Sequence, residues 1–255
     1  MLGVFSRRRG ASPPPSSPPE APAGQRVYAI GDIHGRLDLL RVLLERIQQD
    51  AECHPDAERT LVYLGDYIDR GPDSRQVVEH LVTAQPSGMR SVFLMGNHEE
   101  SLLGFIEDPE AYAGWLSYGG LATLVSYGID PGPHMAALPL PDLAEELLAR
   151  IPEQHLNFLR RLQEAYVLGD YLFVHAGIRP GVPVELQSRQ DLLWIRGDFL
   201  RSTAPHPKVI VHGHNISEEP EIKANRIGID TGAYASGCLT CVVLQGRSRS
   251  FIDTR

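Results

Sequence analysis

The sequence predicts an α/β fold with a mostly helical insertion. Three observations lead to this prediction. Short β-branched or apolar runs recur along the chain, and helical patterns follow the first three of them. In the first half, neighbouring runs are separated by about the 30 residues of a βαβ unit. We therefore expect a parallel sheet in the first half of the chain.

The five predicted strands are almost wholly apolar, which is typical of strands buried on both faces. They comprise residues 27–30, 61–64, 92–95, 171–174 and 209–211. Two series of apolar residues at helical spacing follow the first two strands, and we expect a helix at each. The series are Leu37, Leu40, Leu44 and Ile47, and then Val77, Val78, Leu81 and Val82.

The middle and the end of the chain have different patterns. Residues 108–165 begin with loops rich in Gly and Tyr and continue with helical patterns at 143–151 and 156–166, so we expect a mostly helical insertion there. Residues 227–252 return to strand-like alternation, and we expect antiparallel hairpins.

The N-terminal segment differs from the rest in composition. Residues 11–25 contain six prolines and no large apolar side chain. Such a segment buries too little apolar surface to offset its ordering entropy. We expect residues 1–25 to form a disordered, Pro-rich tail, with weak docking on a partner's aromatic groove as a secondary possibility, and residues 26–255 to form one folded domain.

Composition excludes several classes of protein. The net charge is −8, and because residues 1–25 carry +2 (Arg7, Arg8 and Arg9 against Glu20) the rest carries −10, which argues against a nucleic-acid-binding protein. No apolar run approaches the roughly 18–20 residues of a membrane span. Three cysteines suit a reducing compartment, and the first residues do not resemble a secretory signal, so we expect a cytoplasmic protein that does not bind a membrane.

A small polar cluster follows each predicted strand. Carboxyl ends of strands form the ligand crevice of open α/β sheets, so side chains from these clusters should converge. In chain order the clusters are Gly31-Asp32-Ile33-His34-Gly35, Gly65-Asp66-Tyr67-Ile68-Asp69-Arg70-Gly71, Gly96-Asn97-His98-Glu99, His175-Ala176-Gly177 and His212-Gly213-His214-Asn215.

This ordered set resembles the catalytic core of the phosphoprotein phosphatase branch of the calcineurin-like metallophosphoesterases. The resemblance implies a central β-sandwich flanked by helices. Two departures separate the chain from eukaryotic members: Met95 stands where they have Arg, and residues 230–234 replace their SAPNYC-type segment. Residues 119–128 look like the insertion of bacterial members, so we expect a bacterial-type enzyme.

The resemblance also implies two divalent metal ions, with Asp66 bridging them. Asp32 and His34 would complete the first site, and Asn97, His175 and His214 the second. Mixed oxygen and nitrogen ligands suit Mn, with Fe or Zn as alternatives. Hydrolysis would proceed by attack of a metal-bridging hydroxide.

Catalytic and substrate-binding roles follow from the same motifs. His98 matches the general acid, and Asp69 would hold its other ring nitrogen. Arg70 matches the phosphate clamp. Arg196 is a second candidate clamp, with an ordinary surface ion pair as the alternative.

Other residues have simpler interpretations. Glu99 is expected to support its turn by hydrogen bonding, and His212 to have a structural role. For Trp115, Tyr118 and Tyr127 packing is favoured over lining a substrate pocket. The histidines outside the motifs are expected to be solvated, namely His54, His80, His134, His155 and His206.

Three functions are compatible with the motifs. The leading hypothesis is a serine/threonine protein phosphatase acting on a phosphoprotein or a small phosphorylated substrate. The second is symmetrical hydrolysis of diadenosine tetraphosphate, because those hydrolases share the five motifs. The third is a pseudoenzyme or interaction module recruited through the Pro-rich tail, which the intact ligand set disfavours.

Overall fold

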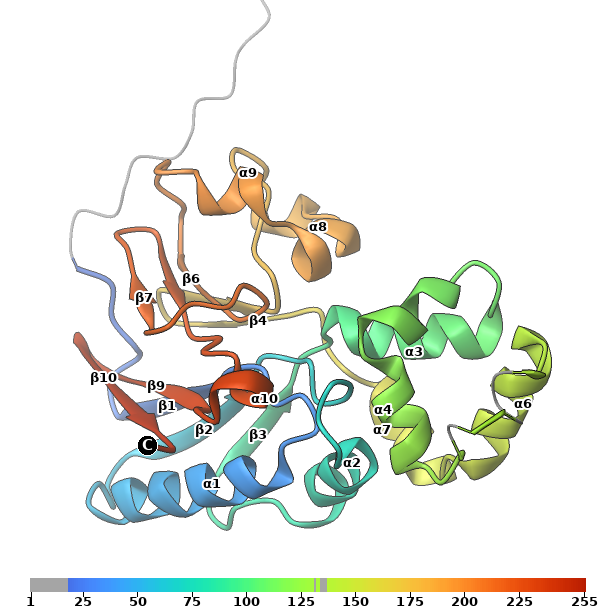
Figure 1. Cartoon of the computed structure of the whole chain (residues 1–255). Helices are drawn as coiled ribbons and strands as arrows, with labels where there is room; N and C mark the ends of the chain where they lie inside the picture. The colour runs from blue at the N-terminus through green and yellow to red at the C-terminus, as the bar shows by residue number, and fades with distance from the viewer. Residues whose placement is uncertain (1–17, 131, 134–136) are drawn as a thin grey trace, which may run out of the picture.

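Two five-stranded sheets pack face to face, with helices on their outer sides (Figure 1). The computed structural model describes residues 18–130, 132–133 and 137–255. The strand order is β10-β9-β1-β2-β3 in the first sheet and β4-β5-β6-β8-β7 in the second. The predicted α/β sandwich is confirmed.

The first sheet combines a parallel half with an antiparallel hairpin. Strands β1, β2 and β3 are parallel, as the βαβ spacing predicts, and β9 lies antiparallel to both β1 and β10. The connecting helices α1 and α2 pack on its outer face (Figure 1). The bounds are β1 Gln25–Ile30, α1 Leu37–Glu52, β2 Glu58–Tyr63, α2 Ser74–Thr83, β3 Arg90–Phe93, β9 Thr240–Gln245 and β10 Ser248–Asp253.

The second sheet has the parallel strands β5, β6 and β8 at its centre, and β4 and β7 pair with them antiparallel at the two edges. The short helices α8 and α9 cover its outer face (Figure 1). The bounds are β4 Ala165–Leu168, β5 Tyr171–Val174, η2 Val184–Leu186, α8 Arg189–Trp194, α9 Gly197–Leu200, β6 Val209–His212, β7 Glu221–Ile222, β8 Arg226–Gly228 and α10 Ala233–Ser236.

Alternation along each strand explains the layers, because successive side chains point to opposite faces. Val27 and Ala29 face the second sheet and pack with Phe173 and Val211. Tyr28 and Ile30 face the opposite way, into the core formed with α1 and α2. A strand covered on both sides needs apolar residues at every position, which is why these strands read as continuous apolar runs.

The insertion is mostly helical, as expected. It lies beside the sandwich (Figure 1), and with the preceding helix it comprises α3 Asn97–Glu107, η1 Ala113–Tyr118, α4 Gly120–Ser126, α6 Leu140–Arg150 and α7 Glu153–Arg160. The helix predicted at 156–166 is too long. The backbone of Gln163 instead bonds to that of Phe93 and Met95 beside β3, and Tyr166 belongs to β4.

The C-terminal prediction is correct only in part. Strands β9 and β10 form the expected antiparallel hairpin, but β8 pairs in parallel with β6. A strand of three residues carries too little pattern to indicate its partner, and the long connection after β6 is what permits the parallel pairing.

The end of the predicted tail packs against the folded domain. Residues 1–17 of the predicted tail lie outside the described residues, while Ala21 is buried and its N–H donates to the carbonyl of Gly246.

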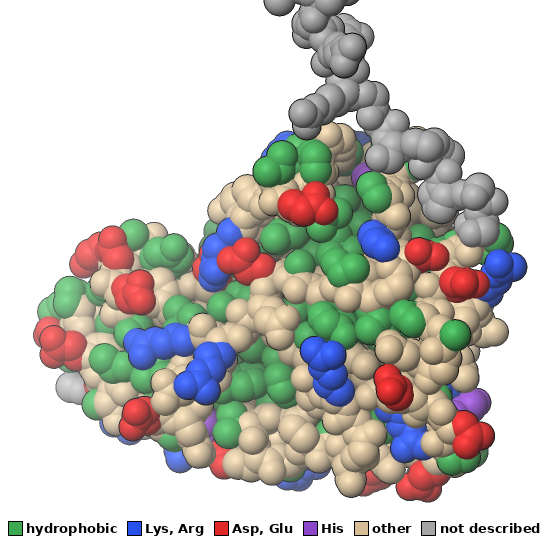
Figure 2. Space-filling model, turned by 180° about the vertical axis from the view of Figure 1, so that it is seen from behind, with side chains coloured by type: hydrophobic (Ala, Val, Ile, Leu, Met, Phe, Trp, Pro, Cys, Tyr) green, Lys and Arg blue, Asp and Glu red, His purple; other side chains and the backbone are tan. Residues whose placement is uncertain are grey.

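His155 and His206 are buried, contrary to expectation. Among the described residues no helix is long and apolar enough to cross a membrane. Figure 2 shows basic and acidic side chains interspersed on one face.

Candidate metal centre

The site forms where the two sheets present the carboxyl ends of their parallel strands. Asp32, Asp66 and Asn97 follow β1, β2 and β3, and His175 and His214 follow β5 and β6. Contacts join the two sets. Nε2 of His175 lies 2.9 Å from Oδ1 of Asn97, and the N–H of His214 donates to Oδ2 of Asp32 at 3.0 Å. The sandwich therefore brings the predicted ligands together from both sheets.

The backbone is unusual at these positions. In the described part of the chain, the non-glycine residues with positive φ are all predicted site residues, with φ between 46° and 73°. They are His34, Asp66, Asp69, Arg70 and His214. The left-handed region is unfavourable for residues with a Cβ and is concentrated at functional sites, so the packing of the fold imposes this geometry on the site.

At two glycines the backbone passes directly against the carboxylate of a predicted site residue. A Cβ at Gly96 would collide with Oδ1 of Asp66, and a Cβ at Gly213 would collide with Oδ1 of Asp32. These glycines are therefore required because the chain passes against a carboxylate.

One group of side chains that could hold a metal ion consists of Asp66, His175 and His214, whose ligand atoms lie within 4.8 Å of one another. Nδ1 of His175 lies 2.9 Å from the carbonyl of Leu64, which makes Nδ1 the protonated nitrogen. Nε2 of His175 then presents a lone pair, and it lies 3.4 Å from Oδ1 of Asp66 and 3.2 Å from Nδ1 of His214. Acceptors facing one another in this way fit a cation.

The second group is His34, Asp66 and His98. Nδ1 of His34 lies 2.8 Å from the carbonyl of Ile68. Its Nε2 is buried, has no hydrogen-bond partner among the described residues and lies 3.5 Å from Oδ2 of Asp66. Asp66 thus belongs to both groups, as expected of a bridging carboxylate. Nε2 of His214 is likewise buried and has no hydrogen-bond partner in the part of the chain that the structure describes.

The role of Asp32 as a metal ligand stays a prediction. Among the described residues Asp32 joins neither group of ligand atoms, and its carboxylate accepts the N–H of His214 beside Gly213. The ring of His98 lies beside that of His34, with their ring centroids 4.7 Å apart.

Burial and neighbouring charge set the protonation states. Burial lowers the pKa of His34 to about 3 and that of His214 to about 2, and it also lowers the pKa of His175. Burial alone would raise the pKa of Asp66, but the surrounding histidines outweigh it and hold that pKa below its usual range. Neutral imidazoles around an ionised carboxylate are the forms that ligate a metal.

Sequence reasoning missed Asp230. This buried residue follows the parallel strand β8 and thus extends the row of strand ends that carry polar side chains. Burial and the neighbouring Asp66 raise its pKa to about 6, and burial together with Asp230 raises the pKa of Asp32. The available signal was the short run Ile227-Gly228-Ile229, which places a carboxylate directly after a strand-like segment.

His98, Asp69 and Arg70 lie side by side. Nδ1 of His98 is 2.5 Å from Oδ2 of the fully buried Asp69, and its Nε2 is 3.2 Å from Nη2 of Arg70. The guanidinium carbon of Arg70 lies 4.7 Å from the ring centroid of Tyr234. Burial lowers the pKa of His98, but Asp66 and Asp69 outweigh it and leave that pKa above its usual value.

Glu99 supports the turn, as expected. Its carboxylate accepts the backbone N–H groups of Gly96, Asp66 and Tyr67 at 3.0, 2.9 and 2.7 Å. It therefore ties the loop after β3 to the loop after β2 and fixes where Asp66 lies.

Arg196 stands apart from the buried groups. It is exposed, and its Nη1 donates to Oδ1 of Asn215, the residue after His214, at 3.2 Å. It lines a polar hollow of about 350 Å³ together with Arg179 and Arg201.

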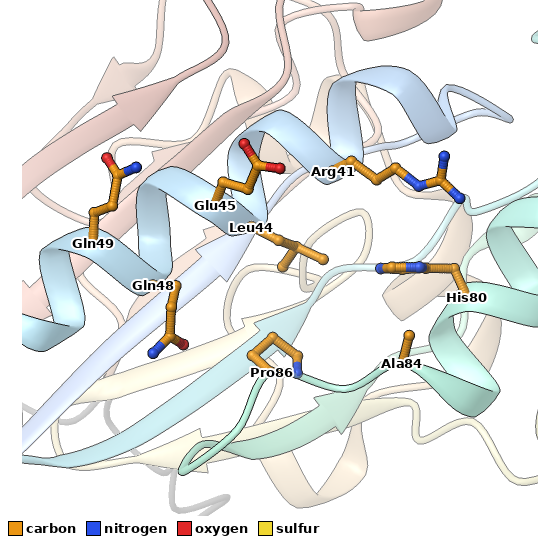
Figure 3. Close-up of a pocket in the computed structure, with 8 residues that line it drawn as sticks. All are labelled: Arg41, Leu44, Glu45, Gln48, Gln49, His80, Ala84 and Pro86. Carbon is orange, nitrogen blue, oxygen red and sulfur yellow. The ribbon is translucent and has the colours of Figure 1, made fainter.

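A second hollow is separate from these groups. It has a volume of about 450 Å³ and lies between α1 and the end of α2 (Figure 3). Arg41, Leu44 and Gln48 line it from α1, and His80 and Ala84 line the opposite side. It contains none of the predicted site residues.

Comparison with known proteins identifies the family. The family model described as "Calcineurin-like phosphoesterase" matches residues 25–235. The chain belongs to this family. Its members use divalent metal ions, in agreement with the His and Asp groups described above.

One curated relative of this phosphoesterase is the "Bis(5'-nucleosyl)-tetraphosphatase PrpE [asymmetrical]" of Anoxybacillus flavithermus, 26% identical and aligned over 84% of this chain and 88% of the relative. A solved structure provisionally named a diadenosine tetraphosphatase has 23% identity and a TM-score of 0.58, over 90% of this chain and 94% of that one. A cold-active protein tyrosine phosphatase has 20% identity and a TM-score of 0.60, over 92% and 80%. At these identities the two structures show the fold alone.

Proposed function

We propose that this phosphoesterase is a dinuclear-metal hydrolase whose substrate is a bis(5′-nucleosyl) tetraphosphate. The observation that supports it most is the carboxylate of Asp66, shared by two groups of buried imidazoles. In the proposal Asp32, His34 and Asp66 hold one metal ion, and Asp66, Asn97, His175 and His214 hold the other. The mixed oxygen and nitrogen donors suit Mn, Fe or Zn. When bound, two such cations neutralise phosphoryl oxygens and activate the attacking water.

The remaining residues act on the substrate. The planar guanidinium of Arg70 grips two phosphoryl oxygens, and Arg196 contributes a second grip from the rim. Nε2 of His98 protonates the leaving oxygen, while Asp69 holds Nδ1 and keeps the ring oriented.

The names of the relatives support the choice of substrate. From the motifs alone, a serine/threonine phosphoprotein is the first candidate substrate and a dinucleoside tetraphosphate the second. Relatives that align over more than four fifths of this chain are named bis(5′-nucleosyl)-tetraphosphatases, which favours the reverse order. Their names specify asymmetrical cleavage, so we propose release of AMP and ATP from diadenosine tetraphosphate, whereas symmetrical cleavage would release two ADP.

A phosphoprotein remains the second candidate, and one surface favours it. Leu121, Val125 and Tyr118 are exposed on η1 and α4. Gly119, in the same segment, accepts the N–H of Arg70 through its carbonyl. An apolar face therefore borders the phosphate clamp, where it could contact the residues that flank a phosphoserine or phosphothreonine.

Product analysis separates these functions. Chain loaded with Mn²⁺ is incubated with diadenosine tetraphosphate, a phosphoserine peptide and a phosphotyrosine peptide, with Asp66→Asn as the inactive control. We expect AMP and ATP in equal amounts. Two ADP would indicate the symmetrical mode, and turnover of the phosphoserine peptide alone would reverse the order of the two candidates. No turnover of any substrate by the native chain would refute a hydrolytic function.

A further inference from the structure

The carboxylate of Asp69 is held from the insertion. Nε1 of Trp115 donates to Oδ2 of Asp69 at 2.7 Å, and Oγ1 of Thr123 donates to Oδ1 at 2.5 Å. Trp115 belongs to η1 and Thr123 to α4, and both are buried. His98 is the third partner of the same carboxylate, through Nδ1.

The insertion also fixes the backbone beside this carboxylate. The N–H of Asp69 donates to Oγ1 of Thr123 at 3.0 Å, and the N–H of Arg70 donates to the carbonyl of Gly119 at 3.2 Å. Gly119 has φ +120°, and a Cβ there would lie 2.7 Å from Cγ of Arg70. Two consecutive residues in the left-handed region are thus held by one segment of the insertion.

A carboxylate with a single partner can rotate about its Cβ–Cγ bond, and the direction of its lone pairs then varies. Here each oxygen of Asp69 has its own donor from the insertion, so the lone pair offered to His98 has a fixed direction. Hydrogen bonds to an ionised group are stronger than neutral ones, and a rigid partner lowers the cost of bringing a catalytic group into place.

We propose that Trp115 and Thr123 are positioning residues for the general acid of this enzyme. They orient Asp69, which orients His98, whose Nε2 gives a proton to the leaving oxygen and becomes neutral as the phosphorus–oxygen bond breaks. This inference rests on the proposed function of His98. The insertion is then part of the catalytic machinery.

The hydrogen bond from Trp115 to Asp69 can be tested without measuring enzyme activity. The chain has two tryptophans, so an ¹H–¹⁵N spectrum of the full chain contains two indole N–H signals, which Trp194→Phe assigns. The indole of Trp194 donates to Glu100. Asp69→Asn should shift the Trp115 signal and leave the Trp194 signal in place. An unmoved Trp115 signal would overturn the positioning role.

The catalytic consequence is tested with two substrates that differ in leaving group. Trp115→Phe keeps an aromatic ring against Phe105, whose ring centroid lies 5.1 Å away, and Thr123→Val keeps the shape of threonine. We expect kcat on an alkyl phosphate to fall about tenfold or more in both variants, because general-acid catalysis is weakened. KM, and kcat on an activated aryl phosphate, should stay within about twofold, and Thr123→Ser should restore the rate.

Tyr112, exposed at the start of η1, provides the control, because Tyr112→Phe removes a hydroxyl that bonds to no part of Asp69. Equal losses on both substrates, without rescue by serine, would show a packing role and overturn the proposal. If the native chain cleaves neither these two phosphates nor diadenosine tetraphosphate, the proposed function fails and the positioning role fails with it. An unmoved indole signal in an active enzyme overturns the positioning role alone.

Discussion

The Nη2 atom of Arg70 lies 3.2 Å from Nε2 of His98. A phosphoryl oxygen gripped by this guanidinium is therefore placed next to the nitrogen that would protonate the leaving oxygen. Oδ2 of Asp66 lies 3.8 Å from the same ring nitrogen, so the proposed clamp, the proposed acid and the carboxylate shared by the two groups lie close together.

Removing the acid should affect poor leaving groups selectively. We expect His98→Ala to lower kcat on an alkyl phosphate by about 10²–10⁴, the usual contribution of general-acid catalysis. An aryl phosphate with a low-pKa leaving group needs no proton, so its rate should change little. Metal content, measured on the same sample, should remain at the native level. Equal loss on both substrates would contradict the role assigned to His98.

The two arginines should differ in importance. Lysine retains the charge but cannot grip two oxygens, so Arg70→Lys should lower kcat/KM by about tenfold or more. The matched variant Arg196→Lys alters an exposed side chain that bonds to Asn215, and we expect a smaller loss. Steady-state kinetics on one substrate compares them. A larger loss for Arg196→Lys would exchange their roles.

Asp66→Asn should empty at least one metal site, because a single amide oxygen replaces two carboxylate oxygens that serve two groups of imidazoles. Metal analysis after gel filtration measures the stoichiometry. The control is Asp38→Asn, which removes a carboxylate bonded to Arg36 at the surface. Full occupancy in the Asp66 variant would remove its bridging role.

Glu99→Gln should destabilise the fold more than Glu100→Gln. The Glu99 carboxylate accepts four buried N–H groups, and the amide would turn N–H toward some of them. The free energy of unfolding should fall by about 1–3 kcal/mol. Glu100 bonds to Arg189 and Trp194 near the surface, so its loss should be about 1 kcal/mol or less. Urea denaturation measures both. Equal effects would contradict the special role of Glu99.

His212 should make the fold acid-sensitive. Burial lowers the pKa of His212 to about 4, whereas the unfolded residue has a value of about 6.5. The unfolded state therefore binds the extra proton between these values, and stability is lost as pH falls through this window. Between pH 7.5 and pH 5, native chain should lose about 2 kcal/mol more than His212→Asn, which keeps a donor at the position of Nδ1.

Urea denaturation in a chelator at the two pH values measures that difference, since the other histidines are common to both proteins. His54→Gln, at a partly exposed histidine outside the motifs, serves as the control and should follow the native chain. An identical pH dependence in native chain and His212→Asn would show that His212 does not titrate between folded and unfolded states as argued.

Part of this structure could be predicted from the sequence and part could not, and the reason is physical. The motifs around Asp32, Asp66 and His175 could be located because each follows an apolar run, and strand ends converge in this class of fold. Asp230 was missed because β8 has only three residues, too few to reveal a parallel partner.

The contacts of Trp115 and Thr123 with Asp69 were beyond sequence reasoning for another reason. They span 46 and 54 residues and depend on how an irregular segment folds back on the sheet. A tryptophan among apolar residues is most simply interpreted as a core residue. The acceptor of its indole N–H cannot be identified until the path of the chain is known.

The left-handed backbone at His34, Asp66, Asp69, Arg70 and His214 has a consequence for engineering. Each such residue costs about 1–2 kcal/mol relative to a relaxed backbone, and glycine would remove that cost. Selection for heat resistance alone would therefore tolerate glycine wherever this gain exceeds the loss of side-chain contacts, and such variants would lose the proposed metal ligands or phosphate clamp. Thermostable variants that still turn over substrate must come from selection for activity and stability together.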